Sequence, residues 1–177
     1  MTGGYLGRLG VEGTLTTVPL PDAGGMPAMI TSGPDGAQWL TLNAENAVGR
    51  LDPHGHRIDT HPLPTGGAGP VGIAADRDVV WFAEFLAGRV GRISPDGAIE
   101  EWDLPDRASK PHAVAPDGAG GCWATLWGSG ELAYLDATGG CTVTALGPAA
   151  APHGLAVVGS DVWVALESCA VVRVGPA

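Results

Sequence analysis

Positive charge is scarce in this chain. Its 177 residues include 9 lysines and arginines against 19 aspartates and glutamates, so the formal net charge is −10 at pH 7. Nucleic acids and anionic membrane surfaces would repel such a protein, because their phosphates carry charge of the same sign. We therefore expect neither kind of partner.

Long apolar runs and paired cysteines are also lacking. No stretch approaches the roughly 20 apolar residues of a membrane-spanning helix, and residues 1–8 lack the apolar centre of a secretion signal. A cytoplasmic protein is the expectation that follows. The three cysteines, Cys122, Cys141 and Cys169, are odd in number and far apart, which predicts reduced thiols and no disulfide framework or zinc site.

The chain repeats one unit of about 42 residues. Four tryptophans mark the period, since Trp39, Trp81, Trp123 and Trp163 follow one another at intervals of 42, 42 and 40 residues. The segments between turns are too short for helices and are rich in the residues that strands prefer. A period of about 40 residues that holds four short strands is typical of a β-propeller blade. We predict an all-β protein, a β-propeller of four-stranded antiparallel blades with a tryptophan packed between neighbouring blades.

The same period predicts the blade boundaries within a single propeller domain. Three whole units at 25–66, 67–107 and 108–148 lie between partial units at 5–24 and 149–177. The partial units could pair and close a ring of four blades, which would hide two strand edges, or the chain could form part of a larger propeller. An open arc would expose a blade face as well as strand edges, and in that case we expect self-association.

Two histidines break the repeat at one position. After the proline that opens each unit, the four units carry Ala28, Val71, His112 and His153. A single histidine here could simply cap a strand entrance. Because two neighbouring units share the change, we interpret His112 and His153 as functional residues.

Hairpin geometry adds two further residues to this pair. If residues 159–161 form a turn, His153 lies opposite Glu167, with the side chains about 5 Å apart on one sheet face. The same folding in the preceding unit places His112 opposite Trp127. All four residues then lie on one rim of the propeller, where substrate sites of this architecture are built. A histidine beside a glutamate can be a proton-transfer pair, the start of a hard-metal site or a surface ion pair.

Other polar residues are predicted to have no chemical role. Glu84 follows Trp81 by three positions, so strand alternation directs it away from the face of His153, and we expect it on a solvated blade edge. His54 and His56 occupy a turn, and turn formation explains them without a metal site.

Three segments of the chain resemble the virginiamycin B lyases, also called streptogramin B lyases. The segments are Lys110-Pro111-His112-Ala113-Val114, Ala151-Pro152-His153-Gly154-Leu155 and Val162-Trp163-Val164-Ala165-Leu166-Glu167-Ser168-Cys169. The resemblance covers almost the whole chain and implies a seven-bladed propeller, of which about four blades are present. It also implies an enzyme that linearises type B streptogramin antibiotics with Mg²⁺, cutting the ring ester by elimination instead of hydrolysis.

The resemblance assigns roles to the rim residues. It implies that His153 is the proton-accepting catalytic residue, that Glu167 binds magnesium and that His112 contacts the substrate. Trp127, which lies on the same rim, is a further substrate-binding candidate. One departure is Ala151, because the family usually has a glutamate two residues before the catalytic histidine as a second magnesium ligand. Glu167 alone would hold Mg²⁺ weakly.

Two alternatives to a lyase remain at this point. A non-catalytic propeller scaffold that binds a ligand on the same rim, or a decayed lyase paralogue, is favoured by Ala151 and by the incomplete set of blades. A propeller lactone hydrolase with a central calcium ion is less well supported, because the sequence shows no convergent set of Asp, Asn and Glu ligands. The two histidines and Glu167 favour the lyase.

Overall fold

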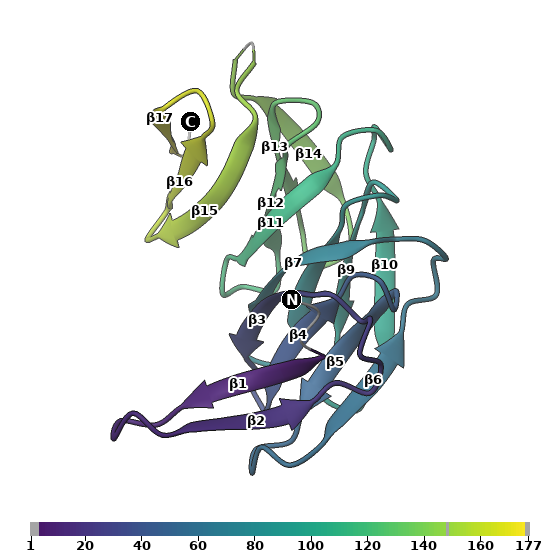
Figure 1. Cartoon of the computed structure of the whole chain (residues 1–177). Coiled ribbons are helices and arrows are strands. Elements are labelled where there is room, and N and C mark those ends of the chain that lie inside the picture. The colour runs from purple at the N-terminus through teal and green to yellow at the C-terminus, as the bar shows by residue number, and fades with distance from the viewer. Residues whose placement is uncertain (1–3, 148, 176–177) are drawn as a thin grey trace.

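The protein folds into strands joined by short turns. The structure is a computed structural model that describes residues 4–147 and 149–175, and within these ranges the 17 regular elements are all strands (Figure 1). They are β1 (Tyr5–Leu9), β2 (Leu15–Pro19), β3 (Pro27–Ser32), β4 (Gln38–Leu42), β5 (Ala47–Leu51), β6 (Ile58–Pro62), β7 (Pro70–Ala75), β8 (Val80–Glu84), β9 (Arg89–Ile93), β10 (Ile99–Asp103), β11 (Pro111–Pro116), β12 (Cys122–Leu126), β13 (Glu131–Leu135), β14 (Cys141–Ala145), β15 (Pro152–Val158), β16 (Asp161–Leu166) and β17 (Ala170–Val174).

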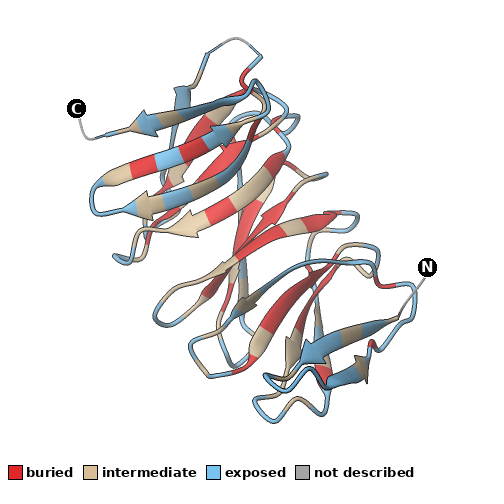
Figure 2. Ribbon diagram, turned by 60° about the vertical axis from the view of Figure 1, so that its left-hand side comes forward, coloured by how far each residue is buried: buried red, intermediate tan, exposed pale blue. Residues whose placement is uncertain are grey.

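The strands form five antiparallel sheets in chain order. Three sheets have four strands each (β3–β6, β7–β10 and β11–β14), whereas β1–β2 forms a two-stranded sheet and β15–β17 a three-stranded one. This arrangement confirms the predicted all-β fold with four-stranded antiparallel blades. The first and last sheets do not pair with each other, and the two ends of the chain lie at opposite ends of an arc (Figure 2). The four-bladed ring is therefore not the form that this chain takes.

Glycines at a fixed phase of the repeat make the turns. Gly55, Gly97 and Gly139 have φ angles of 76°, 92° and 88°. These values lie in the left-handed region, where a side chain would clash with the backbone and only glycine is unstrained. The turns between the third and fourth strands of each blade follow directly from these residues.

The tryptophans of the inner sheets form the core between blades. Trp39 and Trp81 are fully buried, and Trp81 packs with Val90 of its own sheet and with Val114 and Leu126 of the next sheet. Buried residues concentrate in the central sheets (Figure 2). The last tryptophan, Trp163, is 42% exposed, because no further sheet covers the last one. The prediction that tryptophans pack between blades holds for the inner repeats and is wrong for Trp163.

Burial predicts unequal costs of removing two equivalent tryptophans. Trp81→Ala should lower the free energy of unfolding by about 3–5 kcal/mol, because it leaves a cavity between two sheets. Trp163→Ala, its matched control at the same repeat position, should cost less than about 2 kcal/mol, since much of that indole is already in water. Guanidinium denaturation of both variants measures the difference. Equal losses would contradict the packing described here.

Buried threonines connect neighbouring sheets. The hydroxyl of Thr41 donates a hydrogen bond to the carbonyl of Val71 at 2.7 Å, and that of Thr125 donates to the carbonyl of His153 at 2.8 Å. Both threonines are fully buried, so these bonds satisfy polar groups that have no access to water. Each bond fixes the start of an inner strand in the next blade, and one of them fixes the backbone of His153.

The cysteines are free thiols, as predicted: Cys122 is buried, Cys141 is partly buried and Cys169 is exposed. In the described part of the chain there is no helix of the length and apolar character needed to cross a membrane.

Candidate functional site

One rim of the arc collects side chains from the last three sheets. The innermost strand of each sheet begins at this rim and its neighbour ends there, so two repeat positions meet. The second residue of the innermost strand is Val71, His112 or His153. The residue directly after the neighbouring strand is Phe85, Trp127 or Glu167.

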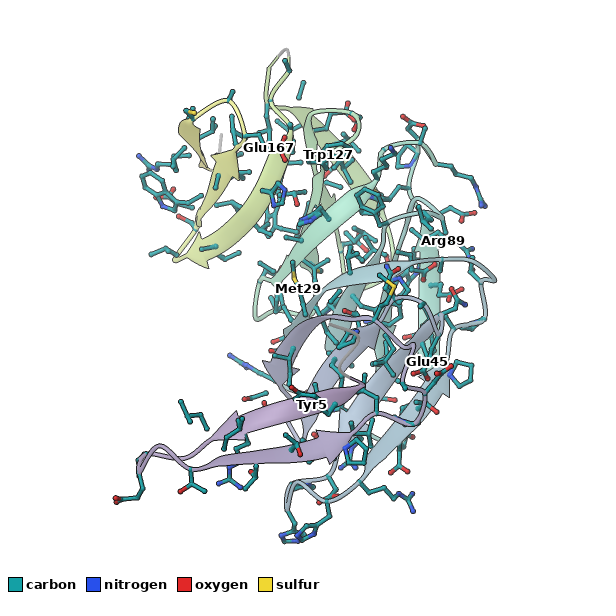
Figure 3. The ribbon with its side chains drawn as sticks, viewed as in Figure 1. Tyr5, Met29, Glu45, Arg89, Trp127 and Glu167 are labelled. Atoms are coloured by element: carbon teal, nitrogen blue, oxygen red, sulfur yellow. The ribbon has the colours of Figure 1, made fainter. Side chains whose placement is uncertain are left out.

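Four sequence-predicted residues come together on this rim. His153 Nε2 lies 3.1 Å from Glu167 Oε1, and the indole N–H of Trp127 donates a hydrogen bond to the same oxygen at 3.1 Å. The imidazole rings of His112 and His153 have centroids 4.1 Å apart. Trp127 and Glu167 lie side by side on adjacent sheets (Figure 3). The side chains of His153 and Glu167 are each about half exposed, so a ligand can reach them.

The strand register that predicted these contacts is wrong in detail. Glu167 donates its backbone N–H to the carbonyl of Ala151 and so faces that residue, not His153. The register between β15 and β16 shifts after Pro152, and this bulge brings His153 close to Glu167. In the preceding sheet the N–H of Trp127 bonds to the carbonyl of Lys110 in the same way.

Sequence reasoning missed Phe85. Its ring centroid is 6.2 Å from that of His112 and 6.0 Å from that of Trp127, so it bridges two residues that we expected to face each other directly. The ammonium group of Lys110, the single lysine of the chain, lies 5.7 Å from the Phe85 ring and 5.4 Å from the Trp127 ring. The repeat does indicate Phe85, because it occupies the same repeat position as Trp127 and Glu167.

Burial keeps one of the two histidines neutral. Removal from water lowers the pKa of His112, and the neighbouring His153 lowers it further, against an opposing effect of the Glu167 carboxylate. Its Nδ1 atom is buried and has no hydrogen-bond partner among the described residues. Neutral His112 therefore has one donor and one acceptor nitrogen at physiological pH, and the buried Nδ1 is not open to a ligand.

The expectation for Glu84 is wrong. Its side chain is fully buried and not on a solvated edge. Strand alternation does direct it away from His153, but Arg89 on β9 and Glu101 on β10 lie close to it on that side of β8. Burial, followed by the negative charge of Glu101, raises the pKa of Glu84 to about 8.

His54 and His56 lie in the turn between β5 and β6, where a carboxylate organises the backbone. The carboxylate of Asp52 accepts hydrogen bonds from the backbone N–H groups of His54 and His56, which stabilise the turn. Among residues 4–147 and 149–175, no three His, Cys, Asp or Glu side chains lie close enough together to hold a metal ion.

The donor set at the rim can accept a divalent ion through one carboxylate. Glu167 Oε1 is engaged by His153 and Trp127, which leaves Oε2 as the oxygen for a metal ion. Mg²⁺ is commonly bound by one or two carboxylates and keeps several waters, so this set fits the ion but holds it weakly. Ala151, whose carbonyl bonds to Glu167 N–H, offers no second carboxylate.

Curated and solved virginiamycin B lyases are similar to this chain. A curated virginiamycin B lyase of Nocardia farcinica is 52% identical over 96 residues, which make up 53% of this chain and 34% of that protein. A solved streptogramin B lyase has a TM-score of 0.91 at 34% identity and covers 97% of this chain. A catalytically inactive virginiamycin B lyase of Staphylococcus aureus, solved with quinupristin, has a TM-score of 0.93 at 30% identity and covers 98% of this chain.

This chain corresponds to only part of the length of each relative. The chain spans 58% and 60% of the length of the two solved lyases. The sequence profile of the virginiamycin B lyase family matches residues 1–174, and this chain belongs to that family.

Proposed function

We propose that this chain carries the catalytic rim of a lyase that linearises type B streptogramin antibiotics by Mg²⁺-assisted elimination at the ring ester. The observation that carries the proposal is the cluster in which His153 and Trp127 both contact one oxygen of Glu167 and His112 lies beside His153. A relative with the same fold was solved with quinupristin, which supports a cyclic depsipeptide as the ligand.

His153 is the base in this proposal. If its Nε2–H is donated to Glu167, the lone pair of Nδ1 is free to accept a proton, and the carboxylate fixes this tautomer. The base removes the proton alpha to a carbonyl of the residue that bears the ester oxygen. The C–H electrons form a Cα=Cβ double bond while the Cβ–O bond breaks. The products are a free carboxylate and a dehydrated residue, and no water is added.

The remaining rim residues bind the metal ion and the substrate and hold the base in place. Bound at Glu167, Mg²⁺ would supply positive charge that stabilises the negative charge developing on the ester. Neutral His112 and the half-buried indole of Trp127 contact the substrate, and Thr125 holds the backbone of His153 through its hydrogen bond of 2.8 Å.

Ala151 supports a second candidate function. Without a second carboxylate, the rim could bind a cyclic peptide and fail to turn it over, as expected of a binding scaffold or a decayed paralogue. The chain also spans only 58% of the length of a solved streptogramin B lyase, which supports the same alternative.

Incubation with quinupristin and Mg²⁺ separates these functions. Chromatography with mass analysis should show a linear product of unchanged mass, because elimination adds no atoms, whereas hydrolysis would add one water. Binding without product would favour the scaffold. Absence of both binding and product at millimolar Mg²⁺ would overturn the proposed function.

We also propose that the exposed apolar faces at the two ends of the arc cause self-association. The last sheet exposes Val158, Trp163 and Val171, and the first exposes Leu9 and Leu15. In the inner sheets the residues equivalent to Val171 are fully buried, and of those equivalent to Trp163 two are fully buried and Trp123 is partly buried, so this face is one that a further sheet would cover.

Light scattering should therefore give a mass above that of the monomer, rising with concentration. Trp163→Glu should lower the associated fraction several-fold, because a charge on this face opposes its burial. Val143→Glu on β14, an outer strand of another sheet, is the control and should leave association unchanged. A monomer at high concentration would contradict the proposal.

A further inference from the structure

A glutamate replaces a leucine at one buried position of the repeat. Glu84 ends β8, where the equivalent residues of the other blades are Leu42, Leu126 and Leu166. Its side chain is fully buried, like those of Leu42 and Leu126. Leucine satisfies the packing at this position, and burial of a carboxyl group has a free-energy cost, so packing alone does not account for Glu84.

Charged groups face Glu84 from two neighbouring strands. Arg89 comes from β9, and Glu101 and Asp103 come from β10. On the other side, β7 has no charged residue, and the titratable residue of β11 is His112, which lies in the rim cluster. Arg89 forms ion pairs with Glu101 and Asp103, and the hydroxyl of Thr65 donates to Glu101 at 2.7 Å.

The carboxyl group of Glu84 has no hydrogen-bond partner in this arrangement. Both of its oxygens are buried without a partner among the described residues, and Glu84 lies opposite Arg89 in the register of β8 and β9. A carboxylate buried in this way beside a second negative charge is costly, because it is neither solvated nor hydrogen-bonded and the two charges repel each other. Arg89 is already paired with Glu101 and Asp103, so Glu84 is the carboxyl group that keeps its proton.

This network supports two walls of the rim site. Phe85, which contacts His112, directly follows Glu84 in the chain. The segment from residue 104 to 110 leads from β10 to His112, and Arg107 within it pairs with Asp103 of the network at 2.6 Å. The backbone of Arg107 also packs on Gly88, so closely that a Cβ there would clash with it. Disturbance around Glu84 would therefore reach both Phe85 and His112.

We propose that Glu84 is a proton-dependent positioning residue, whose neutral carboxyl group packs without repulsion beside the Arg89–Glu101 ion pair and so keeps Phe85 and the segment leading to His112 in place. Ionisation of Glu84 creates repulsion with Glu101 and competes for Arg89, which loosens both walls. The inference about positioning is independent of chemistry at the rim. Its consequence for ligand binding rests on the proposed function.

The imidazole Hε1 resonance of His112 reports on this support directly. His112 titrates below the ordinary histidine range, so above pH 7 its resonance responds to its surroundings, including the ring of Phe85. In the parent protein the resonance should move between pH 7 and 9. In Glu84→Gln, a neutral variant of the same shape, it should stay constant. Glu100→Gln, which removes an exposed acid of β10, is the control and should behave like the parent.

A resonance that is constant in the parent, or that moves equally in Glu84→Gln, would overturn the inference. Stability gives a second measurement. Because the folded state holds a proton that the unfolded chain releases above pH 4.5, the stability of the parent should fall from pH 4.5 to about 8 and level off above it. Glu84→Gln should lose that part of the fall. The same pH dependence in both proteins would contradict the assignment.

Quinupristin binding tests the link to function. The affinity of the parent should fall about fivefold or more between pH 7 and 9, in the range of moderate coupling between sites, and that of Glu84→Gln should not. An affinity independent of pH in the parent would overturn the link. If neither protein binds quinupristin while the His112 resonance behaves as expected, the proposed function fails and the positioning role of Glu84 stands.

Discussion

The variant His153→Ala is expected to lose ring opening of a type B streptogramin by a factor of about 10²–10⁴, which is the usual contribution of general base catalysis. The loss follows from removing the imidazole that lies 3.1 Å from Glu167 and beside His112. Initial rates of product formation, measured by chromatography at saturating Mg²⁺, give the ratio. His56→Ala is the matched control, because it removes an exposed turn histidine outside the rim cluster.

Glu167→Gln separates the roles of the base and of the metal ligand. The amide keeps the shape of the side chain but binds Mg²⁺ poorly, so its rate should fall and recover in part as Mg²⁺ is raised. His153→Ala should show no such recovery, because added metal does not replace a base. If His153→Ala keeps the parent rate, the proton is removed by another group and the binding scaffold becomes the better interpretation.

The fold could be predicted from the sequence because the boundaries of each repeat are visible in it. The tryptophans, the opening prolines and the turn glycines recur together, and they mark the core, the start of each unit and the turns of a short-stranded blade. The arc form was less accessible to sequence reasoning. Whether the first and last sheets pair depends on the curvature summed over the sheets, and no single repeat specifies that quantity.

The site was predicted with the right residues and an incorrect local geometry. Simple hairpin counting placed His153 opposite Glu167, whereas the bulge after Pro152 produces their contact. A bulge depends on packing against the neighbouring sheet, and here Thr125 of the preceding sheet donates a hydrogen bond to the carbonyl of His153. Phe85 is apolar and therefore gives no chemical signal in the sequence, although its repeat position is that of Trp127 and Glu167.

The burial of Glu84 shows a limit of predictions from strand alternation. Strand alternation gives the side of a strand on which a residue lies, but not what covers that side. Charged residues of β9 and β10 lie on that side, and the positive charge of Arg89 opposes the rise that burial and Glu101 cause in the pKa of Glu84. A comparison with the leucines at the equivalent positions would have indicated burial.

The position of Ala151 predicts that a second carboxylate can be restored. Its carbonyl accepts a hydrogen bond from Glu167 N–H at 3.2 Å, so a side chain at this position starts beside the proposed metal ligand. The backbone of Ala151 already has a positive φ of 40° with a non-glycine residue, so glutamate adds little strain there.

Ala151→Glu should therefore raise the affinity for Mg²⁺ by about tenfold or more, because a second carboxylate contributes both a ligand and a negative charge. Titration calorimetry with Mg²⁺ measures the gain without any need for turnover. Ala119→Glu, at an exposed turn between β11 and β12, adds the same charge away from the rim and should leave the affinity unchanged. If Ala151→Glu binds Mg²⁺ no better than the parent, or if Ala119→Glu gains as much, then residue 151 and Glu167 do not face one ion. The role of Glu167 as a metal ligand would then be wrong, and its contacts with His153 and Trp127 would have to be explained by ligand binding alone.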